Sequence, residues 1–272
     1  QGATARSAIS RRMADVERMS GGRLGVAALD LQTNARFGYR ADDRFPMCST
    51  FKAALAGLVL RRVDQGQERL DRVIAYGREA LVDYAPTTEK HVGAGLSVAA
   101  LCEAAVTLSD NTAANLLLGA SGGPAGFTAF VRGLGDAVTR LDRRETEMSE
   151  SRPGDVRDTT SPAAMLGTLR KLVLGPALSP GSREQLMAWL VANQTGEARL
   201  RAGLPHGWRV GDKTGSGGHG TTNDIAVIWP PGRAPLLLCA YLTGAPVSND
   251  ARNAAMASVA RLVTGAGFGG PA

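Results

Sequence analysis

The stretch FPMCSTFKAAL, residues 45–55, decides the fold because it predicts a buried helix that carries a charge. Apolar residues recur at helical spacing from Phe51 onward, so we expect a helix that begins near Ser49 and buries one face. Lys52 is the only charged residue between the arginines at positions 44 and 61. It follows Ser49 by about one helical turn, which places the two side chains on the same face.

Lys52 has two interpretations. A lysine in an apolar segment costs free energy unless it is paired or its pKa falls. An amine that contacts a serine hydroxyl at the start of a helix is one way to activate a nucleophile. Alternatively, Lys52 extends to the surface beside Ser49, which is then an ordinary helix cap. Because Ser-x-x-Lys is a common spacing, the choice depends on the rest of the chain.

The composition excludes several classes of protein. The chain has 272 residues, enough for one large domain or two smaller ones that share an interface. No apolar run reaches the ~18 residues that a membrane-spanning helix needs. The net charge is +6, but the arginines are interleaved with acids and form no basic block. We therefore expect no membrane partner and no nucleic-acid partner.

The cysteines and histidines predict neither a disulfide framework nor a metal site. Cys48, Cys102 and Cys239 are far apart and have apolar neighbours, so we expect small buried side chains. The histidines at positions 91, 206 and 219 are isolated, and no carboxylate cluster is typical of zinc. We expect no metal and no cofactor, and a nucleophile in this chain needs a base other than histidine.

Strands are predicted at both ends of the chain and helices in the middle. The strand candidates are residues 24–31, 36–39, 208–214, 224–229 and 236–242. Helices over residues 6–19 and 249–263 flank them. The economical arrangement is an α/β (α+β) fold, in which a five-stranded antiparallel sheet from both termini is covered by the terminal helices. The central helices then form an inserted lobe, with the active site in the cleft between the two lobes.

Capping residues mark the helices of the inserted lobe. The predicted helices run from Ser97 to 108, over 112–118 with a stop at Gly119, over 124–134, from Ser161-Pro162 to 175, and over 183–192 behind Ser182. Residues 142–158 have no periodicity and much charge, which is typical of a functional loop or of a disordered one. We expect a sheet domain of residues 1–47 and 197–272, and a helical domain of residues 48–196 that includes the loop 143–158.

Three further stretches carry chemistry that suits Ser49 and Lys52. Ser109-Asp110-Asn111 joins two predicted helices, where side chains can project into a cleft. Lys213-Thr214-Gly215 is predicted to end a strand, and its glycine permits close backbone approach to a ligand. Glu145 lies in the charged loop. Taken singly, these stretches are better explained by a helix cap, a plain turn and a solvated charge, respectively. A Walker phosphate loop is excluded because no Gly-Lys-Ser/Thr opens a helix.

Taken together and in this order, the motifs resemble those of class A serine β-lactamases. Ser49-x-x-Lys52, Ser109-Asp110-Asn111 and Lys213-Thr214-Gly215 are similar to the three motifs of that family. Glu145 and its loop resemble a fourth feature, the omega loop. The resemblance covers essentially the whole chain. It implies an enzyme that hydrolyses the amide bond of β-lactam antibiotics, penicillins and cephalosporins, and so confers antibiotic resistance.

The resemblance implies catalytic roles for five residues. Ser49 attacks the β-lactam carbonyl and becomes the acyl-enzyme. Its base is Lys52, or Glu145 acting through a water, and both alternatives stay open. Ser109 relays a proton to the departing nitrogen while Lys213 keeps its surroundings electropositive. Glu145 then activates the water that hydrolyses the ester.

The resemblance also implies the residues that hold the substrate. The backbone N–H groups of Ser49 and Ser216 form the oxyanion hole. Asn111 holds the acylamido side chain, and Tyr84 forms one wall of the cleft. The substrate carboxylate is held by Thr214, Ser216 and Arg199. Ser149 lies beside the hydrolytic water, and Arg143 and Asp158 clasp the two ends of the omega loop.

Several positions depart from the pattern of the family. Arg144 and Thr146 replace the aromatic residue and the proline that often flank the loop glutamate, and Ser149 replaces an asparagine. Thr222 stands where many members supply an arginine, which leaves Arg199 as the alternative. The disulfide partners of Cys48 and Cys102 in other members correspond to Gly217 and Ala56. We therefore expect no disulfides.

The resemblance implies a monomer that is periplasmic or secreted, in a mature form, and whose partners are β-lactam substrates and suicide inhibitors. The nearest alternative is a penicillin-binding transpeptidase or carboxypeptidase, which would lack Glu145 and stay acylated. A second alternative is a β-lactam sensor domain, which normally follows membrane helices. Glu145 in its loop discriminates best and favours the hydrolase.

Overall fold

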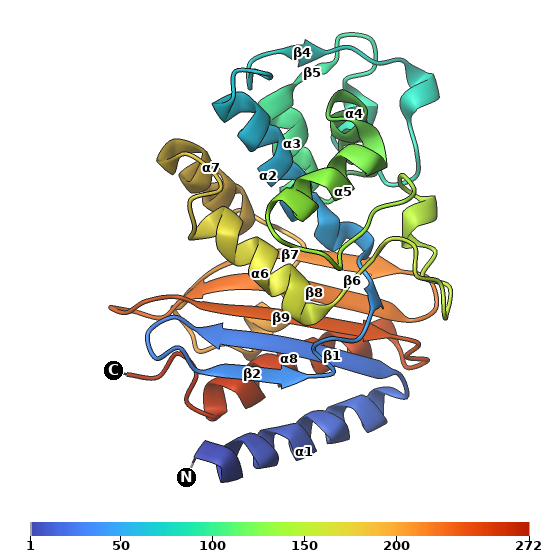
Figure 1. The fold of residues 1–272 in the computed structure, drawn as a ribbon. Coiled ribbons are helices and arrows are strands. Elements are labelled where there is room, and N and C mark those ends of the chain that lie inside the picture. The colour runs from blue at the N-terminus through green and yellow to red at the C-terminus, as the bar shows by residue number, and fades with distance from the viewer. Residues whose placement is uncertain (1, 272) are drawn as a thin grey trace.

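A five-stranded antiparallel sheet with strand order β2-β1-β9-β8-β7 forms the centre of the computed structural model, which describes residues 2–271 (Figure 1). Its strands are β1 (Arg23–Asp30), β2 (Arg36–Tyr39), β7 (Arg209–Gly217), β8 (Thr221–Trp229) and β9 (Leu236–Thr243). The two ends of the chain meet where β1 pairs with β9, from Arg23 opposite Thr243 to Asp30 opposite Leu236. The predicted fold class and the predicted sheet are confirmed.

Helices cover both faces of this sheet. On one face lie α1 (Gly2–Ser20) and α8 (Asn249–Gly265), where Met13, Val26 and Met256 share a core. On the other face α6 (Pro162–Val173) contacts β1 and β9. Successive residues of a strand point to opposite faces, and nearly all of β1 is buried because both of its faces are covered. The cover by terminal helices is as predicted.

The remaining helices pack around α2 (Phe51–Asp64). They are α3 (Val98–Thr107), α4 (Asn111–Ala120), α5 (Gly123–Gly133) and α7 (Pro180–Val191). Every residue of α2 from Phe51 to Leu60 is buried. The prediction that this helix buries only one face is therefore wrong: α3, α4, α5, α6 and α7 all contact it.

Short elements complete the chain. Two small antiparallel pairs join β3 (Phe45–Pro46) to β6 (Thr159–Thr160), and β4 (Val73–Ile74) to β5 (Leu96–Ser97). The 3₁₀ turns are η1 (Cys48–Thr50), η2 (Arg78–Ala80), η3 (Thr88–Lys90), η4 (Glu147–Ser149) and η5 (Leu200–Gly203). Within residues 2–271, no helix combines the length and the apolar character that crossing a bilayer requires.

Local capping was predicted correctly at some helices and wrongly at others. Ser97 and Ser161 cap α3 and α6 through hydrogen bonds from Ala100 N–H and Ala164 N–H. The cap of α7 is Ser179, however, and the Ser182 hydroxyl instead donates to Asp64. Since Pro180 can occupy the first turn of a helix, α7 begins earlier than predicted.

Two ends of elements also differ from prediction. Helix α4 continues through Gly119 to Ala120, one residue beyond the predicted stop. Strand β7 continues through Gly217 because Gly215, Ser216 and Gly217 pair with residues of β8. The stretch from Lys213 to Gly217 therefore does end the strand, as predicted, but β7 continues past the predicted last residue, Thr214. The division into a sheet domain and a helical domain stays a prediction.

Candidate active site

Ser49 lies in the 3₁₀ turn η1, immediately before α2. Strand β7 comes so close to this turn that a Cβ on Gly215 would stand 2.8 Å from the Met47 carbonyl oxygen and 3.1 Å from the Ser49 nitrogen. The side chain of Asn223 donates to the Met47 carbonyl at 3.1 Å and holds the turn from β8. The glycine of the motif thus allows contact with the backbone of η1, where the sequence predicted a ligand.

The Lys52 side chain connects the Ser49 turn with the Ser109 motif. It is 0% exposed, so the alternative in which it extends to the surface is wrong. Its Nζ donates to Asn111 Oδ1 at 2.6 Å, to the Ser109 carbonyl at 2.9 Å and to Ser109 Oγ at 3.2 Å. It also lies 3.6 Å from Glu145 Oε1. Burial lowers the pKa of Lys52, and the charge of Glu145 opposes that shift.

Ser49 contacts the glutamate. The Ser49 hydroxyl donates to Glu145 Oε1 at 3.3 Å. Among the hydrogen bonds of residues 2–271, none joins Lys52 Nζ to the Ser49 hydroxyl. The predicted amine–hydroxyl contact is therefore replaced by a serine–carboxylate contact, with the amine one step away.

A second lysine reaches Ser109 from the opposite side. Lys213 is 0% exposed, and its Nζ donates to Ser109 Oγ at 3.1 Å and to the Thr214 carbonyl at 2.7 Å. Burial lowers the pKa of Lys213 well below its ordinary value, and the nearby charge of Lys52 lowers it further. Ser109 Oγ thus accepts hydrogen bonds from two buried amines, which is a chemically suitable position for proton transfer.

Asn115, which sequence reasoning missed, fixes Glu145. The Asn115 side chain accepts from the Glu145 N–H at 2.9 Å and donates to the Glu145 carbonyl at 2.8 Å. Ser149 donates to Glu145 Oε2 at 3.1 Å. A signal was present in the sequence, because Asn115 follows Asn111 by four residues and so lies on the same face of α4.

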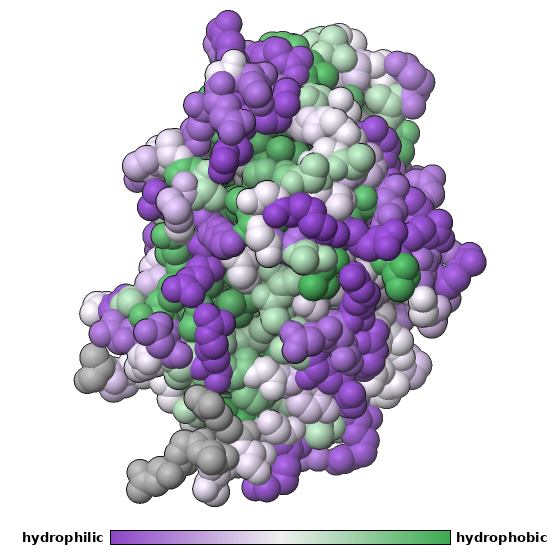
Figure 2. Space-filling model, in the orientation of Figure 1, coloured by the Kyte–Doolittle hydropathy of each residue, from purple (hydrophilic) through white to green (hydrophobic). Residues whose placement is uncertain are grey.

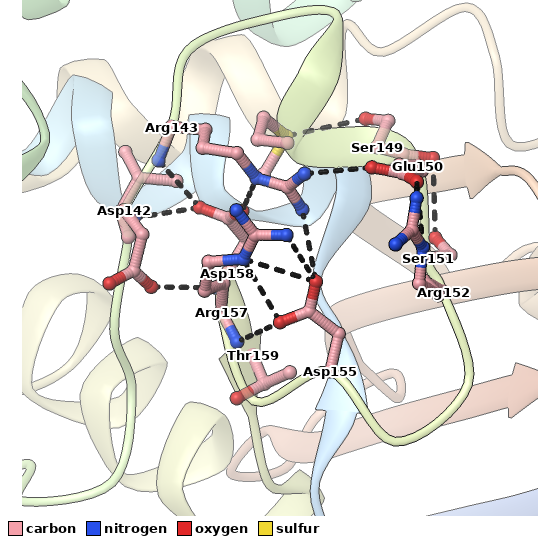
Figure 3. A network of polar contacts seen from close by, with 12 residues as sticks. Asp142, Arg143, Ser149, Glu150, Ser151, Arg152, Asp155, Arg157, Asp158 and Thr159 are labelled. Carbon is pink, nitrogen blue, oxygen red and sulfur yellow. Dashed lines mark hydrogen bonds and ion pairs between the residues drawn. The ribbon is translucent and has the colours of Figure 1, made fainter.

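The loop 143–158 is closed by a network around Asp158 (Figure 3). Asp158 Oδ1 accepts from the N–H groups of Asp142 and Arg143 at 2.7 and 2.9 Å, and its Oδ2 accepts from Arg143 Nε at 2.7 Å. Arg143 also pairs with Glu150 at 2.9 Å. Figure 2 shows hydrophilic side chains gathered along the edge that carries this loop. The loop is ordered by buried charge, and this order places Glu145.

The loop also contacts the end of β7. The Gly218 N–H donates to the Ser149 carbonyl at 3.0 Å. A Cβ on Gly217 would stand 2.5 Å from the Ser149 carbonyl oxygen and 2.6 Å from Cys48 Sγ. Burial raises the pKa of the Cys48 thiol to about 12. Cys48, Cys102 and Cys239 are buried thiols, as predicted. Residues 2–271 contain no group of His, Cys, Asp and Glu side chains arranged for a metal.

The residues expected to hold a carboxylate lie around the exposed Ser216. Arg199 donates to Ser216 Oγ at 2.5 Å and to the carbonyls of Gly215 and Asn223 at 2.9 Å each. Thr214 Oγ1 lies 2.6 Å from Thr195 Oγ1. Burial lowers the pKa of Arg199. The side chain of Thr222 is buried and contributes no arginine-like group here.

Tyr84 and Asn111 lie at the other side of Ser109. The Tyr84 carbonyl accepts from the Asn111 N–H at 3.0 Å, and Asn111 Nδ2 donates to the Asp83 carbonyl at 2.9 Å. Tyr84 is 57% exposed, as a residue at a wall requires. Tyr84 and Ser109 both have positive φ, 63° and 61°, which strains a residue with a side chain. Asp110 caps α4, as one interpretation of the Ser109-Asp110-Asn111 stretch predicted, and it also accepts from the Thr88 hydroxyl, a contact that the sequence did not indicate.

Comparison with known proteins gives consistent matches. The model of a β-lactamase enzyme family matches residues 8–266. Over 255 residues the chain is 50% identical to Beta-lactamase AST-1 of Nocardia asteroides, covering 94% of this chain and 82% of that protein. It is also 50% identical, over 256 residues, to the carbapenem-hydrolyzing β-lactamase KPC of Klebsiella oxytoca, covering 93% and 87%.

Solved structures match equally well. An ancestral class A β-lactamase of Gram-negative bacteria has a TM-score of 0.94 and 69% identity, covering 95% of this chain and 99% of that one. A protein described as a putative class A β-lactamase, PenP of Rhodopseudomonas palustris, also has a TM-score of 0.94, with 61% identity and the same coverage. Identity at this level extends the likeness from the fold to the sequence.

Proposed function

This chain belongs to the class A β-lactamase family and is a β-lactam hydrolase, and from that premise we propose a role for each residue of the site. Ser49 Oγ bonds to the β-lactam carbonyl carbon, and its proton passes to Glu145, directly or through a water. The observation that carries this proposal is the 3.3 Å hydrogen bond from the Ser49 hydroxyl to Glu145 Oε1. Lys52 remains the alternative base.

The next step breaks the bond between the carbonyl carbon and the lactam nitrogen. Ser109 Oγ gives its proton to that nitrogen and takes one from Lys52 Nζ, 3.2 Å away. Lys213 faces the same oxygen at 3.1 Å and stabilises negative charge there. The N–H groups of Ser49 and Ser216 stabilise the oxyanion, each with an effect of ~3–4 kcal/mol on the barrier.

Hydrolysis of the ester completes the cycle. The proton that Glu145 took from Ser49 first passes to Lys52 Nζ, which lies 3.6 Å from Glu145 Oε1. Glu145 then takes a proton from a water, the oxygen of that water bonds to the ester carbon, and Ser49 Oγ leaves with the proton that Glu145 gives up. Ser149 and Asn115 position Glu145 for this step. The clasp of Arg143 and Asp158 keeps the omega loop, residues 143–158, in place.

Substrate binding is assigned to the rim of the site. Thr214, Ser216 and Arg199 hold the substrate carboxylate, Asn111 holds the acylamido group, and Tyr84 forms a wall. Arg199 and Ser216 favour broad activity on cephalosporins with weak turnover of carbapenems. Initial rates on penicillins, oxyimino-cephalosporins and carbapenems test this range, and activity confined to penicillins would contradict it.

The mechanism is tested with a chromogenic cephalosporin and intact mass spectrometry. We expect fast turnover by the native chain. The Glu145→Gln variant, in which Lys52 is the remaining base, should acylate more slowly and then hold the adduct, with deacylation slower by about 10²- to 10⁴-fold. A stable adduct on the native chain would instead indicate a transpeptidase or a sensor. If neither protein acylates, Ser49 is not the nucleophile.

The resemblance also favours an exported monomer, periplasmic or secreted, that suicide inhibitors inactivate. Sedimentation equilibrium tests the monomer, and fractionation of cells that express the full-length gene tests the location. A clavulanate-type compound should produce a covalent adduct on Ser49 that Ser49→Ala lacks.

A further inference from the structure

Two buried aspartates lie on neighbouring strands behind the candidate carboxylate-binding residues. Asp212 precedes Lys213 on β7, and Asp224 faces Thr214 across the β7–β8 pairing. Both are 0% exposed. One oxygen of each, Asp212 Oδ2 and Asp224 Oδ1, is buried without any donor among residues 2–271. A Cβ on Gly196 would stand 2.1 Å from Asp212 Oδ2, so the chain fills the space on that side of the oxygen.

The two carboxyl groups lie on the same face of the β7–β8 pair, because Asp212 pairs with Ala226 and Asp224 stands two residues from Ala226. Each has one buried oxygen without a donor among the described residues. Ionised carboxylates accept hydrogen bonds but do not donate, so a hydrogen bond between these two oxygens requires one proton on the pair. Two carboxylates in one buried site behave in this way because their like charges cannot both persist. Burial and the charge of Asp212 raise the pKa of Asp224 well above its ordinary value.

The outer oxygens indicate which member carries the proton. Asp212 Oδ1 accepts from Arg201 Nε at 2.8 Å and from Asn193 Nδ2 at 2.9 Å. Asp224 Oδ2 accepts only from a backbone N–H, that of Leu200, at 3.1 Å. Because a guanidinium stabilises the ionised form, Asp212 holds the negative charge and Asp224 the proton.

The charge of the pair acts on the site. Arg201 Nε donates to Asp212, and the charges of the pair act on Lys213 and Arg199. Lys52 and Arg252 act in turn on those two cations, and the charge of Asp224 acts on the Cys239 thiol on β9. A pair with one negative charge leaves Lys213 and Arg199 an excess of positive charge for the substrate carboxylate. A doubly ionised pair would cancel much of that excess.

A chain of hydrogen bonds connects the pair with Thr214. Asn193 donates to Asp212, and its Oδ1 accepts from the Thr195 N–H at 3.1 Å and the Thr195 hydroxyl at 2.9 Å. The Thr195 hydroxyl lies 2.6 Å from that of Thr214. The charged acceptor at Asp212 orients the Asn193 amide, and this orientation fixes Thr195 beside Thr214.

We propose that Asp212 and Asp224 share a single proton and are positioning residues for binding of the substrate carboxylate. They keep one negative charge behind Lys213 and Arg199, and they hold Thr214 in place through Asn193 and Thr195. The consequence for substrate rests on the proposed function, whereas the shared proton does not.

Infrared spectroscopy tests the shared proton directly. The native protein, with and without ¹³C in the aspartate carboxyl groups, is measured in heavy water at neutral pH. We expect the C=O stretch of one protonated aspartic acid, shifted by the label, absent from Asp224→Asn and retained in Asp42→Asn, whose carboxyl is exposed. Absence of this band in the native protein, or its persistence in Asp224→Asn, would overturn the proposal.

The pH dependence of binding tests the positioning role. The proton is lost as pH rises through the raised pKa of Asp224, so KM of the native protein for a penicillin should increase across that titration while kcat changes little. An asparagine at 224 stays neutral at every pH, so KM of Asp224→Asn should match the native KM at neutral pH within about threefold. The increase in KM with pH, which we expect to be about tenfold in the native protein, should be absent from the variant. An identical increase in both proteins would refute the positioning role. Absence of any β-lactam turnover would refute the proposed function, and the infrared result would still decide the shared proton.

Discussion

Asn115 holds the backbone of Glu145 with both ends of its side-chain amide: the Glu145 N–H lies 2.9 Å from Asn115 Oδ1, and the Glu145 carbonyl oxygen lies 2.8 Å from Asn115 Nδ2. An amide that is satisfied on both sides fixes the position of a loop residue relative to a helix. The carboxylate of Glu145 therefore reaches Ser49 from a point anchored on α4.

Asn115→Ala removes both of these hydrogen bonds. We expect the free energy of unfolding to fall by about 1–3 kcal/mol, because two buried backbone groups lose their partners. Deacylation should slow by about 10- to 100-fold and more than acylation, because the carboxylate is misplaced. Intact mass during turnover should then show an adduct, and Asn249→Ala, an exposed asparagine at the start of α8, should show neither effect. Native rates of both steps would argue against a specific role at Glu145.

Lys213→Met removes a buried charge whose pKa is lowered. Between this lowered folded pKa and the ordinary value of 10.5, the unfolded chain binds more protons than the folded chain, so the native protein gains stability as pH rises through that window. The difference in unfolding free energy in favour of Lys213→Met over the native protein should therefore be largest at neutral pH, and it should shrink toward alkaline pH. Urea unfolding of both proteins across this range measures it, and a constant difference would contradict it.

Asp158→Asn removes the charge that closes the omega loop. Asp158 is 1% exposed and accepts from Arg143 and from two backbone N–H groups. We expect a loss of about 2–4 kcal/mol in unfolding free energy and faster tryptic cleavage at the arginines of the loop. Asp71→Asn breaks an exposed ion pair with Arg69 and should leave both measurements unchanged. Cleavage at the native rate would show that the clasp does not order the loop.

Gly217→Ala places a methyl group where there is no space. Three atoms lie within 2.7 Å of the added Cβ, those of Ser149, Cys48 and Ser151, so the backbone must shift at a cost of about 1–3 kcal/mol. Gly167→Ala is the matched control, since no atom lies within 4 Å of its Cβ, and in the interior of α6 it should stabilise by about 0.5–1 kcal/mol. Thermal unfolding of the two variants should therefore move in opposite directions.

The sequence predicted elements whose signals are local. The strands alternate with turn residues, and the caps at Ser97 and Ser161 precede apolar periodicity. The errors come from tertiary contacts. Helix α2 is buried on every side because five helices pack around it. Strand β7 continues beyond its predicted end at residue 214 because β8 pairs with it as far as Gly217.

The motif residues were found because their types and order are distinctive. Asn115, Asn193 and the pair Asp212 and Asp224 were missed because each owes its role to a partner distant in sequence. Periodicity reports which face of an element is apolar, but not which buried polar group meets another. The distance from Ser49 to Glu145, and the absence of a bond from Lys52 to Ser49 among the described residues, likewise depend on how α2 meets the loop.

The pairing of β1 with β9 joins residues separated by more than 200 positions. Such contacts slow folding because a long chain must be ordered before they form. During synthesis the edge of β1 has no partner until residues 236–243 have been made, and an unpaired edge is a template for association with other chains. The order of this sheet thus delays its completion until almost the whole polypeptide exists.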